Sequence, residues 1–145
     1  MPTVLDILAS KGSHVHWIGP DATVLEATQI MNDQKIGALV VREGSRVLGI
    51  FTERDVLRRV IAEERQPSAV RVDEVMTRDV ACCTPDMDID EASRVMRDKR
   101  VRHLPVCGDD GGLMGLISIG DLNALHASSQ EQHIHFLSEY VYGRA

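Results

Sequence analysis

The sequence is poor in aromatic residues and has no long apolar run. Phe, Trp and Tyr make up 3% of its 145 residues, so ring stacking is not expected to be the main way of holding a base. No apolar stretch approaches the roughly 18 residues that cross a bilayer, and residues 1–6 lack the charged-then-apolar pattern of a signal peptide. We therefore expect a cytoplasmic protein that has no membrane partner.

Basic residues are also fewer than acidic residues. Lys and Arg number 16 against 22 Asp and Glu, which gives a formal net charge of −6. Nucleic acids and anionic membranes favour clustered basic residues, so neither is expected as the main partner. A few arginines directed at one small anion remain compatible with this balance.

Cysteines are few and lack metal-site spacing. The three cysteines are Cys82, Cys83 and Cys107, and neither a CxxC motif nor another metal-ligand pattern is present, so we expect no metal. Because cysteine is often buried, small apolar strand residues are a simpler interpretation than a redox switch, which stays open as the alternative.

Catalytic motifs are missing as well. No Ser, His and acidic residue are spaced as in a known catalytic set, and no GxxxxGK[ST] loop is present. His133 and His135 stand two apart on an expected helix and do not share a face. Asp109 and Asp110 fall in a glycine-rich turn, where solvation explains them. We therefore predict no catalytic residues and no enzyme activity.

The sequence does contain an internal repeat. Residues 4–8 match residues 72–76, and residues 49–55 match residues 115–121. The offset between the copies changes only between matched blocks, as expected when insertions are confined to loops.

Each copy predicts the same order of elements, a βαββα unit. Short strands are expected at residues 15–18 and 80–83, and helices begin near residues 24 and 89. Hairpins follow, pairing residues 38–41 with 47–51 and residues 103–106 with 113–117, and Pro105 indicates an edge strand. A second helix in each copy starts at Thr52 or Ser118.

These elements predict an α+β fold of two tandem units. The expected boundaries are residues 1–62 for the first unit, 63–71 for a linker, 72–127 for the second unit and 128–145 for a C-terminal helix. One unit of about 60 residues is too small to cover both faces of its sheet. The two should therefore pack as one pseudo-twofold body.

Both copies close with the pattern Gly, two apolar residues, Ser or Thr, any two residues and Asp, at residues 49–55 and 115–121. Together with residues 36–40 and 101–106, this resembles a tandem pair of cystathionine-β-synthase (CBS) domains, or Bateman module, of the small stand-alone bacterial kind. The resemblance implies a regulatory module that binds AMP, ADP, ATP, NAD(H) or S-adenosylmethionine between its repeats. It also implies disc-shaped homodimers that signal to a partner protein, which the sequence does not identify.

The repeated motifs supply the first candidate site residues. Asp55 and Asp121 can each accept hydrogen bonds from a ribose diol, while Thr52 and Ser118 begin helices whose N–H groups suit a phosphate. The same residues also form capping boxes that would occur with no ligand. A ligand-free dimerisation or protein-interaction module is therefore the alternative function.

The remaining candidates fall into two groups. The resemblance implies that Lys11, Thr77, Arg102 and His103 lie on the phosphate side. Gly37, Ala38 and Arg54 are further candidates there, and a solvated Arg54 is the alternative. The expected walls of the base pocket and neighbouring strand positions are His16, Ile18, Ile36, Val80, Ala81, Pro105 and Ile117. Since Arg102 and His103 belong to the second copy, we expect the site with Ser118 and Asp121 to be slightly the stronger.

Overall fold

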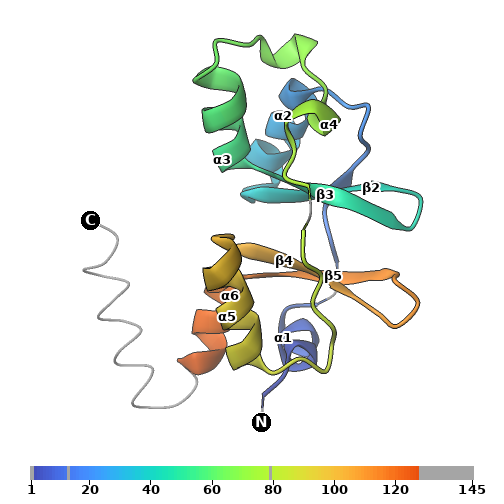
Figure 1. Cartoon of the computed structure of the whole chain (residues 1–145), viewed down its shortest axis with the longest axis vertical. Coiled ribbons are helices and arrows are strands. Elements are labelled where there is room, and N and C mark those ends of the chain that lie inside the picture. Colours follow the sequence, from blue (N-terminus) through green and yellow to red (C-terminus); the bar gives the residue numbers. More distant parts are fainter. Residues whose placement is uncertain (1, 13, 79, 128–145) are drawn as a thin grey trace.

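The computed structural model describes residues 2–12, 14–78 and 80–127. Two small sheets face each other across the middle of the molecule, and helices cover their outer sides (Figure 1). The arrangement is the α+β pair of repeated units predicted from the sequence. The expected helix over residues 128–145 lies outside the described residues, as do His133 and His135.

The first sheet has three strands in the order β1-β2-β3. β1 runs parallel to β2, which forms an antiparallel hairpin with β3. The elements of the first repeat are α1 (Val4–Lys11), β1 (Trp17–Ile18), α2 (Val24–Gln34), β2 (Ala38–Glu43), β3 (Arg46–Thr52), α3 (Glu53–Asp55) and its π-helical continuation η1 (Val56–Ile61). The short 3-10 helix η2 (Pro67–Ala69) falls in the segment expected as a linker.

The second sheet keeps only the hairpin. Its elements are α4 (Val72–Val75), α5 (Ile89–Lys99), β4 (His103–Cys107), β5 (Leu113–Ser118) and α6 (Ile119–His126). The strand expected at residues 80–83 is reduced to one parallel bridge between Cys83 and Val106. Pro105 therefore lies in a two-stranded sheet, where the missing N–H of proline disrupts no extended ladder.

Local signals place the two long helices. The Thr23 side chain accepts a hydrogen bond from the Glu26 N–H at 3.1 Å, and Asp88 accepts one from the Asp90 N–H at 2.8 Å. α2 and α5 both end on a left-handed residue, Lys35 in one repeat and Arg100 in the other. The helix starts predicted near residues 24 and 89 are thus confirmed.

The two repeats exchange their leading helices. The α1 residues Val4, Ile7 and Leu8 pack in the core of the second sheet, whereas Val72 and Val75 of α4 pack in the core of the first. Figure 1 shows α1 beneath β5 and α4 beside α2. The exchange brings the segment that follows each leading helix to the opposite repeat.

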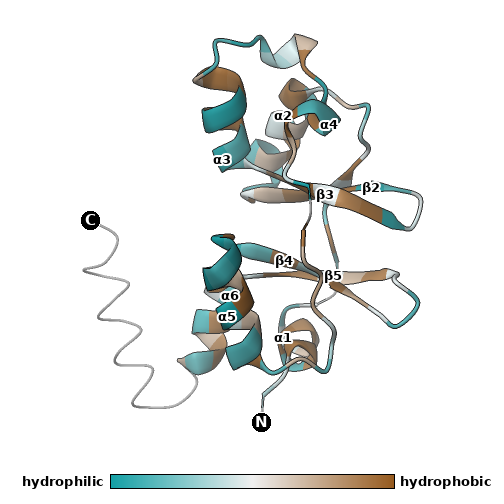
Figure 2. Cartoon of the chain, viewed as in Figure 1, coloured by the Kyte–Doolittle hydropathy of each residue, from teal (hydrophilic) through white to brown (hydrophobic). Residues whose placement is uncertain are grey.

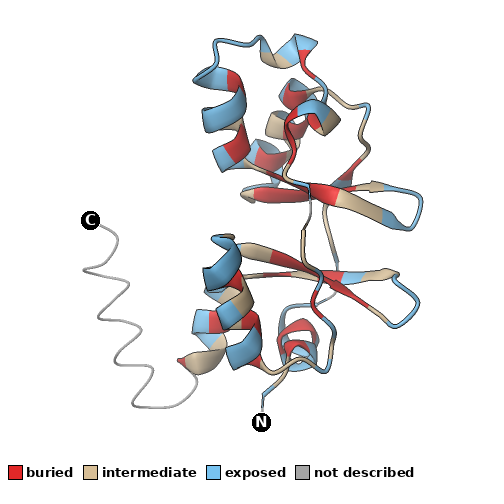
Figure 3. Ribbon diagram, in the orientation of Figure 1, coloured by how far each residue is buried: buried red, intermediate tan, exposed pale blue. Residues whose placement is uncertain are grey.

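Strand alternation separates the cores from the space between the sheets. Leu39 and Phe51 belong to the first core, and Leu104 and Ile117 to the second. Their neighbours along each strand point the other way, toward the facing sheet. Buried residues recur along the strands (Figure 3), and apolar residues recur along the hairpin strands (Figure 2). Within the described chain, no helix combines the length and apolarity needed to span a bilayer.

Candidate functional site

A cavity between the two repeats brings several predicted site residues together. We call it the Asp55 cavity. Its walls come from β3 and the start of α3 on one side, and from the residues preceding β4 on the other. It is lined by Gly37, Ile50, Thr52, Glu53, Arg54, Asp55, Thr77, Val80, Arg100, Val101, Arg102 and His103.

Asp55 is the one buried charged residue among those the structure describes, with 6% of its surface exposed. Its carboxylate accepts a hydrogen bond from the Thr52 N–H at 3.0 Å, and the Thr52 hydroxyl accepts one from the Asp55 N–H at 3.2 Å. This is the predicted capping box. The Nε atom of Arg59 lies 3.7 Å from Oδ1 of Asp55 and gives partial charge compensation.

Thr77 reaches the same carboxylate from the other repeat. Its hydroxyl donates to Oδ1 of Asp55 at 3.2 Å, and its backbone pairs with Ile50 through hydrogen bonds of 2.9 and 3.0 Å. Gly49 permits this crossing, because a Cβ atom there would lie 2.4 Å from the Thr77 carbonyl oxygen. The glycine of the motif therefore makes room for the neighbouring repeat.

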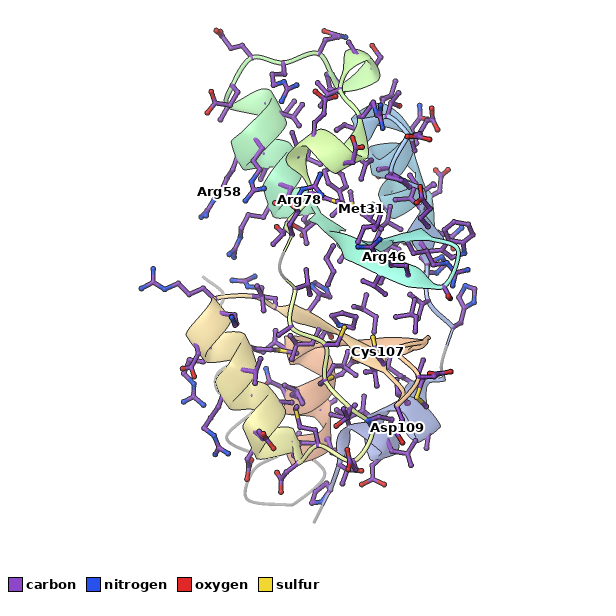
Figure 4. The ribbon with its side chains drawn as sticks, turned by 45° about the vertical axis from the view of Figure 1, so that its right-hand side comes forward. Met31, Arg46, Arg58, Arg78, Cys107 and Asp109 are labelled. Carbon is purple, nitrogen blue, oxygen red and sulfur yellow. The ribbon has the colours of Figure 1, made fainter. Side chains whose placement is uncertain are left out.

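Both walls of the Asp55 cavity contribute cationic residues. Arg54, Arg100 and Arg102 all line it, and none has an acidic partner within 4 Å in the described parts of the chain. An adjoining hollow shares Arg54 and adds Lys35 and Arg58; Figure 4 labels Arg58 on the α3 side of the first repeat. This charge suits a phosphate-bearing ligand.

A second cavity lies at the equivalent motif of the second repeat, and we call it the Ser118 cavity. It is lined by Lys11, His14, Val15, His16, Ile36, Gly37, Ala38, His103, Leu116 and Ser118. Ser118 and Asp121 form the same capping box, with N–H to side-chain distances of 2.8 and 3.1 Å. Here, however, Nζ of Lys11 donates to the Asp121 carboxylate at 2.8 Å and to the Leu116 carbonyl at 2.9 Å.

His103 lines both cavities. Burial lowers the pKa of its imidazole from the ordinary value of 6.5, and the Asp121 carboxylate opposes this shift. The positive charges of Lys11 and Arg102 lower the pKa further. A neutral His103 near pH 7 can donate a hydrogen bond from one ring nitrogen and accept one at the other.

The structure brings most of the predicted residues to the two cavities. The Asp55 cavity holds Gly37, Thr52, Arg54, Asp55, Thr77, Val80, Arg102 and His103. The Ser118 cavity holds Lys11, His16, Ile36, Gly37, Ala38, His103 and Ser118. Asp121 does not line it, and its carboxylate forms an ion pair with Lys11.

Four predicted wall residues lie elsewhere. Ile18 and Ile117 point into the two hydrophobic cores, and Leu116, one position before Ile117, lines the Ser118 cavity instead. The error is one of strand parity, since adjacent residues face opposite sides. Ala81 and Pro105 line neither of these cavities.

The expected partition of the cations also requires correction. Arg102 lines the Asp55 cavity and not the Ser118 cavity, so the premise that it strengthens the second site is wrong. Arg102 directly precedes β4 and lines the same cavity as Thr52 and Asp55 of the first repeat. Arg100 was missed, although its place at the end of α5, equivalent to Lys35 after α2, was a signal in the repeat.

Comparisons with known proteins agree with this architecture. The CBS domain family matches residues 5–62 and 72–126. The mitochondrial CBS domain-containing protein CBSX3 of Arabidopsis thaliana is 33% identical over 150 residues, which cover 97% of this chain and 72% of the relative.

Two solved structures give the same result. A Burkholderia ambifaria protein with CBS domains, provisionally named for signal transduction, superposes with a TM-score of 0.85 at 41% identity, covering 89% of this chain and 96% of the other. The CBS domain pair of protein MJ0100, solved with 5′-methylthioadenosine and S-adenosyl-L-methionine, has a TM-score of 0.76 at 23% identity, covering 86% and 95%. The chain therefore belongs to the CBS-domain family and carries a tandem pair of these domains.

Proposed function

We propose that this chain is a non-catalytic regulatory module that binds an adenosine-containing nucleotide, such as AMP, in the Asp55 cavity. The buried Asp55 carboxylate on the cavity wall carries the proposal. A buried carboxylate is costly unless hydrogen-bond donors satisfy it. The Thr52 N–H and the Thr77 hydroxyl supply two donors, and the cis-diol of a ribose would supply more from the cavity side.

The arginines favour a phosphorylated ligand. Arg54, Arg100 and Arg102 surround the same cavity, and Arg58 and Lys35 continue the positive charge into the adjoining hollow. Ligands with a second or third phosphate, including ADP, ATP and NAD(H), are compatible with this layout. The adenosyl compounds bound by the CBS pair of MJ0100 support the choice of an adenosine ligand.

A regulatory role requires that binding be passed to another protein. We expect a cytoplasmic homodimer that signals to a protein partner, and exposed apolar residues on the helices support such contacts. Leu57 and Ile61 are 63% and 53% exposed and stand one turn apart on η1. The same surface favours a second candidate function, a protein-interaction module that works without a ligand. Measuring the mass of the protein in dilute solution tests the homodimer.

Calorimetry with AMP and 2′-deoxy-AMP tests the binding function. Loss of one charge-assisted hydrogen bond to Asp55 should weaken binding by about ten- to a hundredfold. AMP should also raise the melting temperature, because a ligand that binds the native state stabilises it. Equal affinities for the two nucleotides would remove the proposed role of the carboxylate. Absence of binding across AMP, ADP, ATP and NAD(H) would favour the interaction module.

A further inference from the structure

Two thiols of the second repeat lie in contact, and the nucleotide site does not account for them. The Cys107 Sγ donates to the Cys82 Sγ at 3.0 Å. Cys107 lies on β4 and is 7% exposed, whereas Cys82 is exposed. Figure 4 labels Cys107 in the lower half of the molecule, near the hairpin turn that carries Asp109.

Backbone pairing brings the two sulfurs together. The Cys83 N–H donates to the Pro105 carbonyl, and the Cys107 N–H donates to the Cys83 carbonyl, both at 2.9 Å. Cys83 points into the second core, so its neighbour Cys82 points to the opposite side of the strand pair. Cys107 lies on that side too, since it follows the core residue Val106.

We propose that Cys82 and Cys107 are a modification site that forms a reversible intramolecular disulfide with a small-molecule disulfide such as oxidised glutathione. The exposed Cys82 thiol loses its proton and attacks one sulfur of the small disulfide, releasing one thiolate. Cys107 then loses its proton and attacks the Cys82 sulfur of the mixed disulfide, releasing the second thiolate. The two protein thiols are oxidised, and the small disulfide is reduced to two thiols.

The order of attack follows from exposure. Burial raises the pKa of the Cys107 thiol to about 12, and its hydrogen bond to Cys82 adds to the shift. Cys107 is therefore a poor first nucleophile, but it lies beside the sulfur that the exposed Cys82 would present in the mixed disulfide. A resolving thiol at this position is the arrangement that redox-responsive cysteines use.

Cys83 provides a matched control. It is 1% exposed, and its Sγ donates to the Pro105 carbonyl at 3.5 Å. Burial raises the pKa of this thiol to about 12. A Cys83→Ala variant removes a thiol next to the pair and leaves the pair intact.

Mass spectrometry of the whole chain in glutathione buffers tests the proposal. The wild type and Cys83→Ala should both lose the mass of two hydrogens, with peptide mapping linking residue 82 to residue 107. Cys107→Ser should stop at a glutathione adduct on Cys82, and Cys82→Ser should form no such link. A wild type that ends as a stable adduct, or a disulfide that disappears in Cys83→Ala, would overturn the proposal.

Thermal unfolding of the oxidised and reduced proteins gives a second readout. Closing the loop between residues 82 and 107 restricts the unfolded chain and should raise the melting temperature by about 5 to 10 °C. The rise should be the same in Cys83→Ala. A melting temperature that falls on oxidation would overturn the proposal, because it would mean that the sulfurs bond only after leaving the contact seen here.

Discussion

The two copies of the Gly-to-Asp motif form the same cap but receive different partners. Asp55 accepts a hydrogen bond from the neutral hydroxyl of Thr77, whereas Asp121 accepts one from the ammonium group of Lys11. Both partners arrive from the opposite repeat, because the leading helices are exchanged. Duplication has kept the acidic residue, and the segment that crosses over decides whether its carboxylate remains available to a ligand.

Charge widens the difference between the cavities. The Asp55 cavity is lined by arginines that have no acidic partner within 4 Å in the part of the chain that is described. In the Ser118 cavity, Lys11 is already paired with Asp121. An anionic nucleotide at the second motif would compete with this ion pair, so we expect the Asp55 cavity to bind it more tightly.

Matched substitutions of the two carboxylates should give the largest effect on nucleotide binding. Asp55→Asn keeps an acceptor for the helix cap but removes the charge, and should weaken AMP binding by about ten- to a hundredfold. Asp121→Asn should change AMP affinity by less than about threefold. Calorimetry on both variants decides the comparison. A greater loss in Asp121→Asn would restore the preference for the second repeat.

Much of the fold could be predicted from local signals. Thr23 and Asp88 mark helix starts, and the turns between paired apolar runs mark both hairpins. The exchange of α1 and α4 could not be predicted in this way. The two leading segments, residues 4–8 and 72–76, have similar apolar patterns, so the local pattern does not select the partner.

The residue types of the site were easier to predict than the direction in which each side chain points. Ile50 and Ile117 stand at neighbouring positions of equivalent strands, and a shift of one residue moves a side chain from cavity to core. Arg102 was recognised as a candidate phosphate ligand, but its cavity depends on how the repeats cross. Long-range packing determines which cavity Arg102 lines, and such packing has no sequence motif.

Replacing the motif glycine should destabilise the protein by different amounts in the two repeats. A Cβ at Gly49 would meet the Thr77 carbonyl oxygen at 2.4 Å, whereas a Cβ at Gly115 would meet Cδ2 of Leu8 at 2.6 Å. The side chain can rotate away more easily than the paired backbone can move. We expect Gly49→Ala to lower the free energy of unfolding by about 3 kcal/mol and Gly115→Ala by about 1 kcal/mol, measured by urea unfolding. Equal losses would contradict this account of the crossing.

His103 should give the smallest effect and shows whether one group serves both cavities. Burial lowers its pKa in the folded protein, so the unfolded chain binds the proton more readily below the ordinary value of 6.5. The free energy of unfolding should therefore fall as the pH drops through about 6.5. His103→Gln should flatten this fall between about pH 7.5 and pH 5.5, measured by urea unfolding at each pH. AMP binding near pH 6 should also take up a proton at His103, because a phosphate beside the imidazole favours its charged form. Calorimetry in buffers of different ionisation enthalpy measures that uptake, and an unchanged uptake in His103→Gln would show that the proton goes to another group.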